Sequence, residues 1–331
     1  MNLEKLGIKP HSGLGAVQGI LRRVSLANAS AKIHRLTVME HDGEHDLRPQ
    51  LHFMMFGPTG NFKSTILKKV RDLAQTERNK IPAYKNEHPL PILTDLTKAG
   101  LLGSIGKGGE VIVGSAWSCR NSLLCLDEFL FHSQDDGAEN LTMFLGLLED
   151  ERYARSMGLY SKDVEYRDGD LFYTVHHGKL NVRTSFAMIA ATMKKLDHMR
   201  SPQVHAFVNR CLPYQFKFEE PEQTKILRGE WRFQLDEYNP PLEVKIPKRT
   251  YFNIVRFAKK NLPWGSDQFA ASENFPRAVG DLVRIYAVTG KVEKQFWREI
   301  LLDKVSATSL IGSQYRSPEQ KIAEAIREIK H

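Results

Sequence analysis

The sequence predicts an α/β fold in which a parallel β-sheet lies between layers of helices. Residues 51–56 form an apolar run that is followed at once by a glycine-containing loop and a helical pattern. Residues 122–126 and 186–191 are also apolar runs, as strands of a parallel sheet are when helices cover both faces. Helical patterns then dominate from Thr250 to the end. We therefore expect a sheet-based core followed by a helical region.

The loop after the first strand has the composition of a phosphate-binding loop. Residues 57–65 match the pattern G-x-x-x-x-G-K-[ST] except at Phe62. Unpaired amides at a helix start, with the helix dipole behind them, form a nest for the phosphates of ATP. Lys63 would neutralise phosphate charge, and the Ser64 hydroxyl would ligate Mg²⁺. We expect ATP and Mg²⁺ as cofactors, with the nucleotide bound by Gly57, Pro58, Thr59, Gly60, Asn61, Phe62, Lys63, Ser64 and Thr65.

A second motif follows the strand at residues 122–126, which ends in Asp127 and Glu128. An aspartate at the carboxyl end of a strand can hold the Mg²⁺ shell, and the adjacent glutamate can polarise the attacking water. An ordinary turn into a surface helix would explain the first motif, and an acidic helix start would explain the second. Neither alternative explains why both motifs occur in this order.

Composition places the chain among globular proteins. Its 331 residues are 41% hydrophobic and 26% charged, and the chain is long enough for one large domain and a smaller one. Three cysteines, Cys119, Cys125 and Cys211, lack C-x-x-C spacing, so neither a disulfide framework nor a structural zinc site is indicated. We expect Cys125 to pack in the core of its strand.

The charge and the absence of an apolar span indicate the compartment and the kind of partner. A formal net charge of +8 and a pI near 9.2 favour a polyanionic partner. No run approaches the roughly twenty apolar residues that span a bilayer, and the N-terminus lacks a signal peptide's apolar core. We expect a cytoplasmic, nucleoid-associated protein, or a nuclear one in a eukaryote, with no membrane contact.

Two β-rich stretches interrupt the predicted core. Residues 101–113 contain two short β-rich runs around the glycine turn at 106–109, which indicates a hairpin. Residues 153–185 predict a second, longer hairpin. Residues 139–151 have a helical apolar stripe, residues 1–50 predict a short helical lead, and residues 219–241 predict a connecting region.

With these elements in this order, the chain resembles the AAA+ motor module of the minichromosome maintenance (MCM) helicases over most of its length. Asp127-Glu128-Phe129 matches that family's Asp-Glu-Phe, and Leu180-Asn-Val-Arg-Thr-Ser185 resembles its Leu-Asn-Ala-Arg-Thr-Ser. The family commonly has alanine at the second loop glycine, so Phe62 agrees with it in being a non-glycine residue. The family's N-terminal DNA-binding domain has no counterpart before residue 50, so the resemblance implies a minimal or mobile-element type of motor.

The resemblance implies three further catalytic residues. Thr192 falls where the family has its sensor-1 asparagine, and a hydroxyl can still hydrogen-bond to water. Asn209-Arg210-Cys211 lies at the family's Ser-Arg-Phe, which makes Arg210 the arginine-finger candidate. Arg277 falls at the sensor-2 position. By position alone, a surface salt bridge is the favoured interpretation of each arginine, and the resemblance reverses that preference.

The resemblance also implies a DNA contact, because two hairpins of this family project into the central channel of a hexamer. The first would be residues 101–113, with Lys107 at its turn, and the second would be residues 153–182, lengthened by the insert 159–175. Lys107, Lys162 and Lys179 are therefore the DNA-binding candidates. The implied partners are single-stranded or duplex DNA and further copies of the chain in a homo-hexameric ring.

The predicted organisation is an AAA+ α/β nucleotide-binding core over residues 1–220, with inserted β-hairpins, and a connecting segment with an α-helical lid over residues 221–331. The expected activity is ATP hydrolysis at subunit interfaces, with Glu128 activating water and Arg210 acting from the neighbouring subunit, coupled to DNA translocation or unwinding.

Two other functions remain open. An AAA+ protein-remodelling ATPase of the chelatase type shares the inserted hairpins but acts on protein. A non-hydrolysing DNA-binding or loading factor is a candidate because Phe62 and Thr192 depart from the usual residues, although Lys63, Asp127, Glu128 and Arg210 argue against it.

Overall fold

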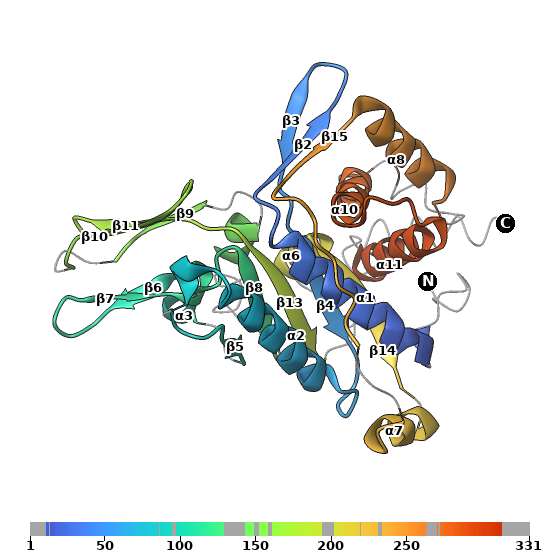
Figure 1. The fold of residues 1–331 in the computed structure, drawn as a ribbon, viewed down its shortest axis with the longest axis horizontal. Helices are drawn as coiled ribbons and strands as arrows, with labels where there is room; N and C mark the ends of the chain where they lie inside the picture. The colour runs from blue at the N-terminus through green and yellow to red at the C-terminus, as the bar shows by residue number, and fades with distance from the viewer. Residues whose placement is uncertain are drawn as a thin grey trace, which may run out of the picture.

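A computed structural model describes residues 11–12, 14–85, 87–94, 97–128, 143–148, 152–157, 161–193, 202–218, 220–230, 234–262, 270 and 272–312. At its centre is a parallel sheet (Figure 1), and the two-residue strand β1 forms one edge of it. The strand order is β1 (His11–Ser12), β14 (Cys211–Lys217), β4 (His52–Phe56), β13 (Phe186–Thr192), β8 (Ser122–Leu126) and β5 (Ile92–Leu93). Every neighbouring pair in it is parallel.

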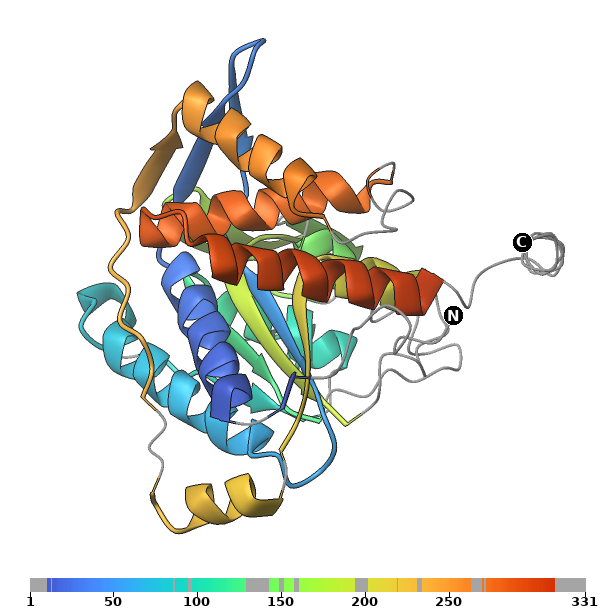
Figure 2. The ribbon, with the colours of Figure 1, turned by 90° about the vertical axis from the view of Figure 1, so that its right-hand side faces the viewer.

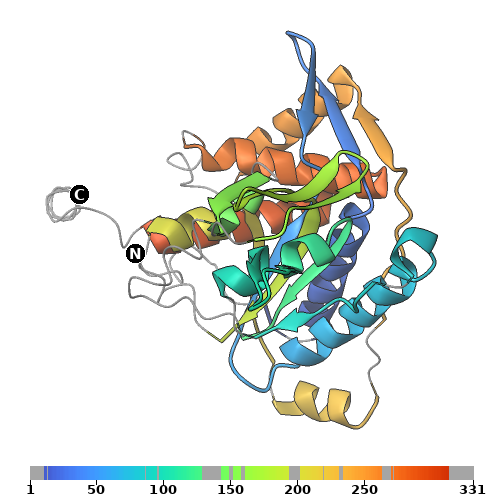
Figure 3. The same ribbon diagram turned by 90° about the vertical axis from the view of Figure 1, so that its left-hand side faces the viewer.

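The central strands are apolar because helices cover both faces of the sheet. Every residue of β4, β8 and β13 is buried. Helices α1 (Leu14–Ser30) and α2 (Lys63–Arg78) contact the sheet from one face, and α6 (Pro202–Asn209) lies on the other (Figure 3). The predicted α/β core with a parallel sheet between helices is confirmed, as is the burial of Cys125 in its strand.

The helices of the C-terminal part pack against the same core. They are α8 (Lys248–Lys260), α10 (Asn274–Thr289) and α11 (Lys294–Gly312). The ring of Trp297 is fully buried and meets Phe257 edge-on at 5.4 Å between centroids. Helix α10 contacts α1, and α11 contacts α6 and β14, so these helices cover one side of the sheet layer (Figure 2). One hydrophobic cluster runs through the sheet and these helices.

A small sheet joins the beginning of the chain to its C-terminal part. Strand β2 (Arg35–Met39) pairs antiparallel with β3 (Glu44–Leu47) and parallel with β15 (Glu243–Ile246). The predicted helical lead is therefore correct for α1 only, because two strands follow that helix. The region predicted as a connection holds α7 (Glu220–Leu227) and part of the extended approach to β15. Segments on either side of residue 220 thus share a sheet.

Two β-insertions extend from the same side of the sheet (Figure 1). The first is the predicted hairpin, β6 (Gly103–Ile105) and β7 (Val111–Val113), flanked by α3 (Lys98–Leu102) and α4 (Ser115–Ser118). The second is a four-stranded antiparallel sheet in the order β10-β11-β12-β9, with β9 (Arg152–Ser156), β10 (Val164–Asp168), β11 (Leu171–His176) and β12 (Lys179–Arg183). The prediction of one longer hairpin is therefore incomplete, because the insert forms the additional hairpin β10–β11.

The remaining predicted helix is seen only in part, since residues 143–148 are helical and the rest of the range 139–151 lies outside the described residues. Phe129 lies outside them as well. None of the described helices combines the length and the apolar character needed to cross a bilayer.

Candidate nucleotide-binding site

The carboxyl ends of three adjacent strands place the predicted motifs at one edge of the sheet. Strand β13 lies between β4 and β8, so the loop after β4, Thr192 and Asp127 emerge side by side. The Gly57 amide donates a hydrogen bond to the Thr192 carbonyl over 3.3 Å. Ligands of parallel α/β sheets bind outside this edge. The strand order therefore brings together motifs that lie far apart in the sequence.

Gly57 is required by a close approach of neighbouring backbone. A Cβ atom added there would lie 2.9 Å from the carbonyl oxygen of Phe216 in β14. Main-chain atoms cannot move away as a flexible side chain can, so any larger residue would displace the loop or the strand. The first glycine of the motif thus has a packing reason in this chain.

Phe62 occupies a position that favours glycine. Its backbone is left-handed, with φ +57° and ψ +15°, and it immediately precedes α2 as the N-cap residue. Such a conformation costs a non-glycine residue about 1–2 kcal/mol. The half-buried ring packs against the core and lies 6.1 Å from the ring of Phe218, centroid to centroid. This packing offsets part of the backbone cost.

The start of α2 offers amide donors at this edge. Its first bond beyond the cap runs from the Ile66 amide to the Phe62 carbonyl, 3.0 Å, and no side chain caps the helix. The amides of the first turn therefore have no intrahelical acceptor, and the helix dipole favours an anion beside them. Ser64 is half-buried and Thr65 is exposed in this turn.

Lys63 lies inside the loop, where its side chain is only 7% exposed. The Lys63 Nζ donates to the carbonyl oxygens of Gly57, at 2.8 Å, and of Pro58, at 2.6 Å. Burial lowers the pKa of Lys63, and the carboxylates of Asp127 and Glu128 oppose that shift. The lysine of the first motif and the acids of the second are therefore close enough to act on one another electrostatically.

The two acids differ in exposure. Asp127 is nearly buried, and its Oδ1 accepts a hydrogen bond of 3.0 Å from the Glu128 amide. Glu128 is exposed and has a left-handed backbone, with φ +50°. Strained backbone of this kind is retained where the surrounding structure holds it, often at functional sites. An inner acid suited to a cation and an outer acid open to water are the arrangement that hydrolysis needs.

Arg210 and Arg277 lie at the opposite edge of the sheet. Both line a pocket of about 300 Å³ that also includes His52, at the amino end of β4. Strand β4 runs from this pocket to the loop that begins at Gly57, and its five residues separate the two by about 13 Å at ~3.3 Å per residue. The structure therefore brings the two predicted arginines together, but not with Lys63 of the same chain.

The lining of the pocket has an excess of positive charge, with four arginines against Asp46 and Asp281. Arg48 and Arg284 line it as well, and the Arg284 Nε donates to the Arg48 carbonyl over 2.7 Å. Asp281 accepts from Arg284 at 3.0 Å and pairs with Lys304 at 2.7 Å. Burial holds the pKa of His52 well below its usual range, and the nearby cations add to the shift. The arginines that line this pocket would attract an anion from outside the chain.

Several of these residues were not predicted from the sequence. The spacing of Arg277, Asp281 and Arg284 puts them on one helix face and could have indicated a shared site. Arg48 and His52 carry no such local signal. Asn61, a predicted residue of the loop after β4, is buried, and its Oδ1 accepts a hydrogen bond of 3.4 Å from Gln223 of α7.

The predicted DNA-binding lysines, Lys107, Lys162 and Lys179, are all exposed on the two insertions. The Lys162 amide donates to the Gly109 carbonyl over 2.9 Å, so Lys162 adjoins the turn that carries Lys107. Lys179 begins β12 and lies opposite His176 and Ser156. The insertions also contact each other near their bases, where the Tyr173 hydroxyl donates to the Leu102 carbonyl over 3.0 Å.

An ion-pair network connects helix α2 to the second insertion. Arg78, the last residue of α2, pairs with Glu87, which also pairs with Arg120. Arg120 donates from Nε to Asp168 over 2.9 Å, and Tyr84 donates to the same carboxylate. Asp168 ends β10, so a continuous polar contact runs from α2 to the four-stranded sheet.

No protein-family model matches this sequence, and a search of curated proteins finds no match to it either.

Proposed function

We propose that this chain is an AAA+ ATPase motor of the MCM type, which hydrolyses ATP between the subunits of a ring and moves DNA. The observation that supports the proposal best is the distribution of charged groups over the sheet. Lys63, Asp127 and Glu128 lie at the carboxyl edge. Arg210 and Arg277 lie in one pocket at the amino edge. Each edge carries half of an ATPase site.

Two half-sites on different surfaces favour a head-to-tail assembly. Contacts between unlike surfaces generate closed rings when the rotation between neighbours closes, as in a homo-hexamer. In such a ring, Arg210 and Arg277 of one subunit would approach the γ-phosphate bound to the next. A trans arginine is worth about 10³ to 10⁵ in rate in other NTPases. An isolated subunit should therefore hydrolyse ATP poorly.

Within this proposal each residue has one task. The loop amides and Lys63 hold the phosphates, Ser64 and Asp127 hold Mg²⁺, and Glu128 activates water. Thr192, at the end of the strand between the two motifs, would help to position that water. The helices after residue 247 would form the lid, and the insertions with Lys107, Lys162 and Lys179 would contact DNA.

The test is the ATPase rate with and without single-stranded DNA. We expect magnesium-dependent turnover that DNA stimulates and that Glu128→Gln abolishes. Turnover indifferent to DNA but raised by a protein partner would support the remodelling alternative. Nucleotide binding without any turnover, with or without DNA, would support the non-hydrolysing factor.

A further inference from the structure

A single row of side chains crosses the solvent face of the four-stranded sheet. Arg167 of β10 lies opposite Phe172 of β11, Phe172 lies opposite Arg183 of β12, and Arg183 lies opposite Arg152 of β9. Residues directly opposite on neighbouring strands point to the same face. Three arginines and one aromatic ring therefore form one row. We call this set of four residues the arginine row.

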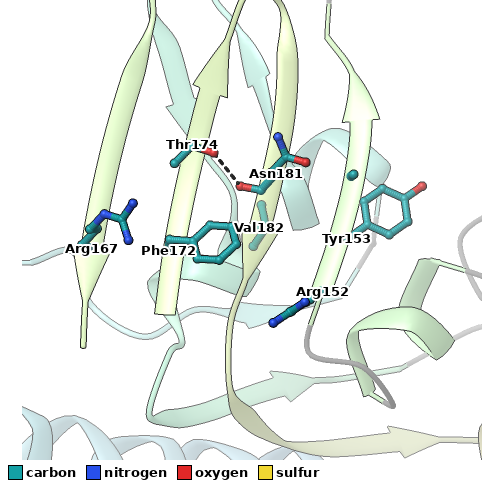
Figure 4. Close-up of a pocket in the computed structure, with 8 residues that line it drawn as sticks. Arg152, Tyr153, Arg167, Phe172, Thr174, Asn181 and Val182 are labelled. Atoms are coloured by element: carbon teal, nitrogen blue, oxygen red, sulfur yellow. Dashed lines mark hydrogen bonds between the residues drawn. The ribbon is translucent and has the colours of Figure 1, made fainter. Parts of the chain in front are cut away.

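A pocket of about 560 Å³ lies over three of the four residues of the arginine row, all but Arg183 (Figure 4). Arg152, Arg167 and Phe172 line it, together with Thr174 and Asn181 of the next row. The Thr174 hydroxyl donates to the Asn181 carbonyl over 3.5 Å. Among the described residues the side-chain amide of Asn181 has no hydrogen-bond partner, so it can bond to a ligand.

Phe172 does not belong to the hydrophobic core. The neighbouring residues whose side chains alternate to the other face of the sheet are buried in the hydrophobic core; they are Tyr173, Leu180 and Val182. Phe172 is half-buried, and the core cluster and its partly buried neighbours do not include it. In Figure 4 its ring projects from β11 towards Val182 of β12. The ring therefore lies at the solvent face of the sheet, outside the hydrophobic core.

The charges of the arginine row are unfavourable for the sheet itself. Arg152 and Arg183 are direct cross-strand partners, and like charges in that position destabilise a sheet. Neither has a carboxylate partner within the described part of the chain. Arg167 pairs only with Glu165 of its own strand, and both side chains are more than half exposed. An anionic ligand would compensate this repulsion.

We propose that the arginine row binds single-stranded DNA, with Phe172 stacked on an unpaired base and the arginines on the flanking phosphates. Aromatic rings on a positively charged groove are the general means of holding single strands, because every base has a face that can stack. In a duplex that face is already covered by the next base pair. The inference rests on the proposed function only for the identity of the anion, and it adds a contact separate from the exposed lysines.

Fluorescence anisotropy tests the role of the Phe172 side chain. It measures binding of a labelled oligothymidine of about 20 nucleotides to the full chain. Phe172→Ala should weaken binding about 5- to 150-fold, which corresponds to the loss of one stacked base. Phe172→Tyr keeps an aromatic ring and should bind as the wild type does. Circular dichroism checks that both variants are folded.

The salt dependence of the same binding tests the arginines. The double variant Arg152→Gln, Arg183→Gln should reduce the slope of log affinity against log salt by about 1.4, at ~0.7 per phosphate contact on a single strand. The matched control is Arg249→Gln, Arg256→Gln, which removes two exposed arginines from α8. The control should leave the slope unchanged.

Wild-type affinity in Phe172→Ala, or duplex DNA bound as tightly as the single strand, would overturn the inference. It would also be overturned if the arginine variant changed the sedimentation of the assembly but not its DNA affinity, because the row would then be a subunit contact. DNA-free ATPase should be unaltered in all these variants. If they behave as wild type while Lys107→Ala, Lys179→Ala loses DNA stimulation, this inference fails and the proposed function stands.

Discussion

The ring of Phe62 packs against the ring of Phe218 at 6.1 Å, although the backbone of Phe62 is left-handed. The loop after β4 thus combines an unfavourable backbone with a favourable side-chain contact at one residue. Phe218 follows directly after β14, so the contact ties the loop to the strand whose backbone also crowds Gly57.

This balance predicts an unusual order of stabilities. Phe62→Ala loses the ring and keeps the strained backbone, whereas Phe62→Gly loses the ring and relieves the strain. We expect the glycine variant to be more stable than the alanine variant by about 1 kcal/mol. Urea unfolding of the two variants measures the difference. An alanine variant as stable as the glycine variant would show that Phe62 is not strained.

The two motifs at the carboxyl edge should fail in different ways. Lys63→Ala removes the charge that faces the phosphates and should abolish nucleotide binding. Glu128→Gln keeps the shape of the side chain but not its basicity, so it should bind ATP normally and not hydrolyse it. Binding of a fluorescent ATP analogue and steady-state turnover separate the two defects. Wild-type turnover in Glu128→Gln would mean that another group is the general base.

The exposed lysines should matter for DNA alone. The double variant Lys107→Ala, Lys179→Ala should lower DNA affinity and DNA-stimulated turnover. It should leave DNA-free turnover nearly unchanged, because both lysines lie on the insertions and not at the carboxyl edge that carries Lys63. The control is Lys259→Ala, Lys260→Ala, which removes two exposed lysines from α8. Equal DNA binding by the two double variants would exclude the predicted lysines from the DNA contact.

His52 should make the stability depend on pH. Burial keeps His52 neutral in the folded protein, and its Nδ1 accepts a hydrogen bond of 3.2 Å from the Met188 amide. The unfolded chain takes up a proton there below about pH 6.5. Stability from His52 is therefore present above that pH and lost as the pH falls, at about 1.4 kcal/mol per pH unit.

The variant His52→Asn keeps an acceptor for the Met188 amide and does not titrate, so its unfolding free energy should fall less steeply between pH 6.5 and 5. His34→Asn, at an exposed position, is the control and should follow the wild type. Urea unfolding at several pH values gives the slopes. Identical slopes in wild type and His52→Asn would show that His52 is not kept neutral.

The sequence predicted those parts of the fold that local patterns determine. The apolar runs correctly predicted β4, β8 and β13, and the glycine turn at 106–109 correctly predicted the β6–β7 hairpin. The dipeptide Asp168-Gly169 is a common hairpin signal, but the prediction of one hairpin over residues 153–185 did not treat it as a separate turn. Strands β2 and β15 pair across most of the chain length, and no local pattern encodes such a partner.

The residues of the candidate site were predicted from the sequence, but their separation between the two edges of the sheet was not. The motif spacing indicated Lys63, Asp127 and Glu128, which parallel strands bring to one edge because their carboxyl ends coincide. The motif alone could not show that Phe62 is left-handed, since this depends on the loop geometry. The sequence did not show that Arg210 and Arg277 line one pocket with Arg48 and His52, because this depends on how α10 packs near the amino ends of the strands.

Mixing of subunits tests the central claim, that ATP is hydrolysed between chains, most directly. Arg210→Ala and Lys63→Ala should each be inactive alone. In an equal mixture that exchanges subunits, about a quarter of the interfaces in a head-to-tail ring pair an intact loop with an intact arginine, so turnover should reappear. Recovery that peaks near the equal ratio is the predicted result. No recovery at any ratio, in a mixture shown to exchange subunits, would contradict a site shared between chains.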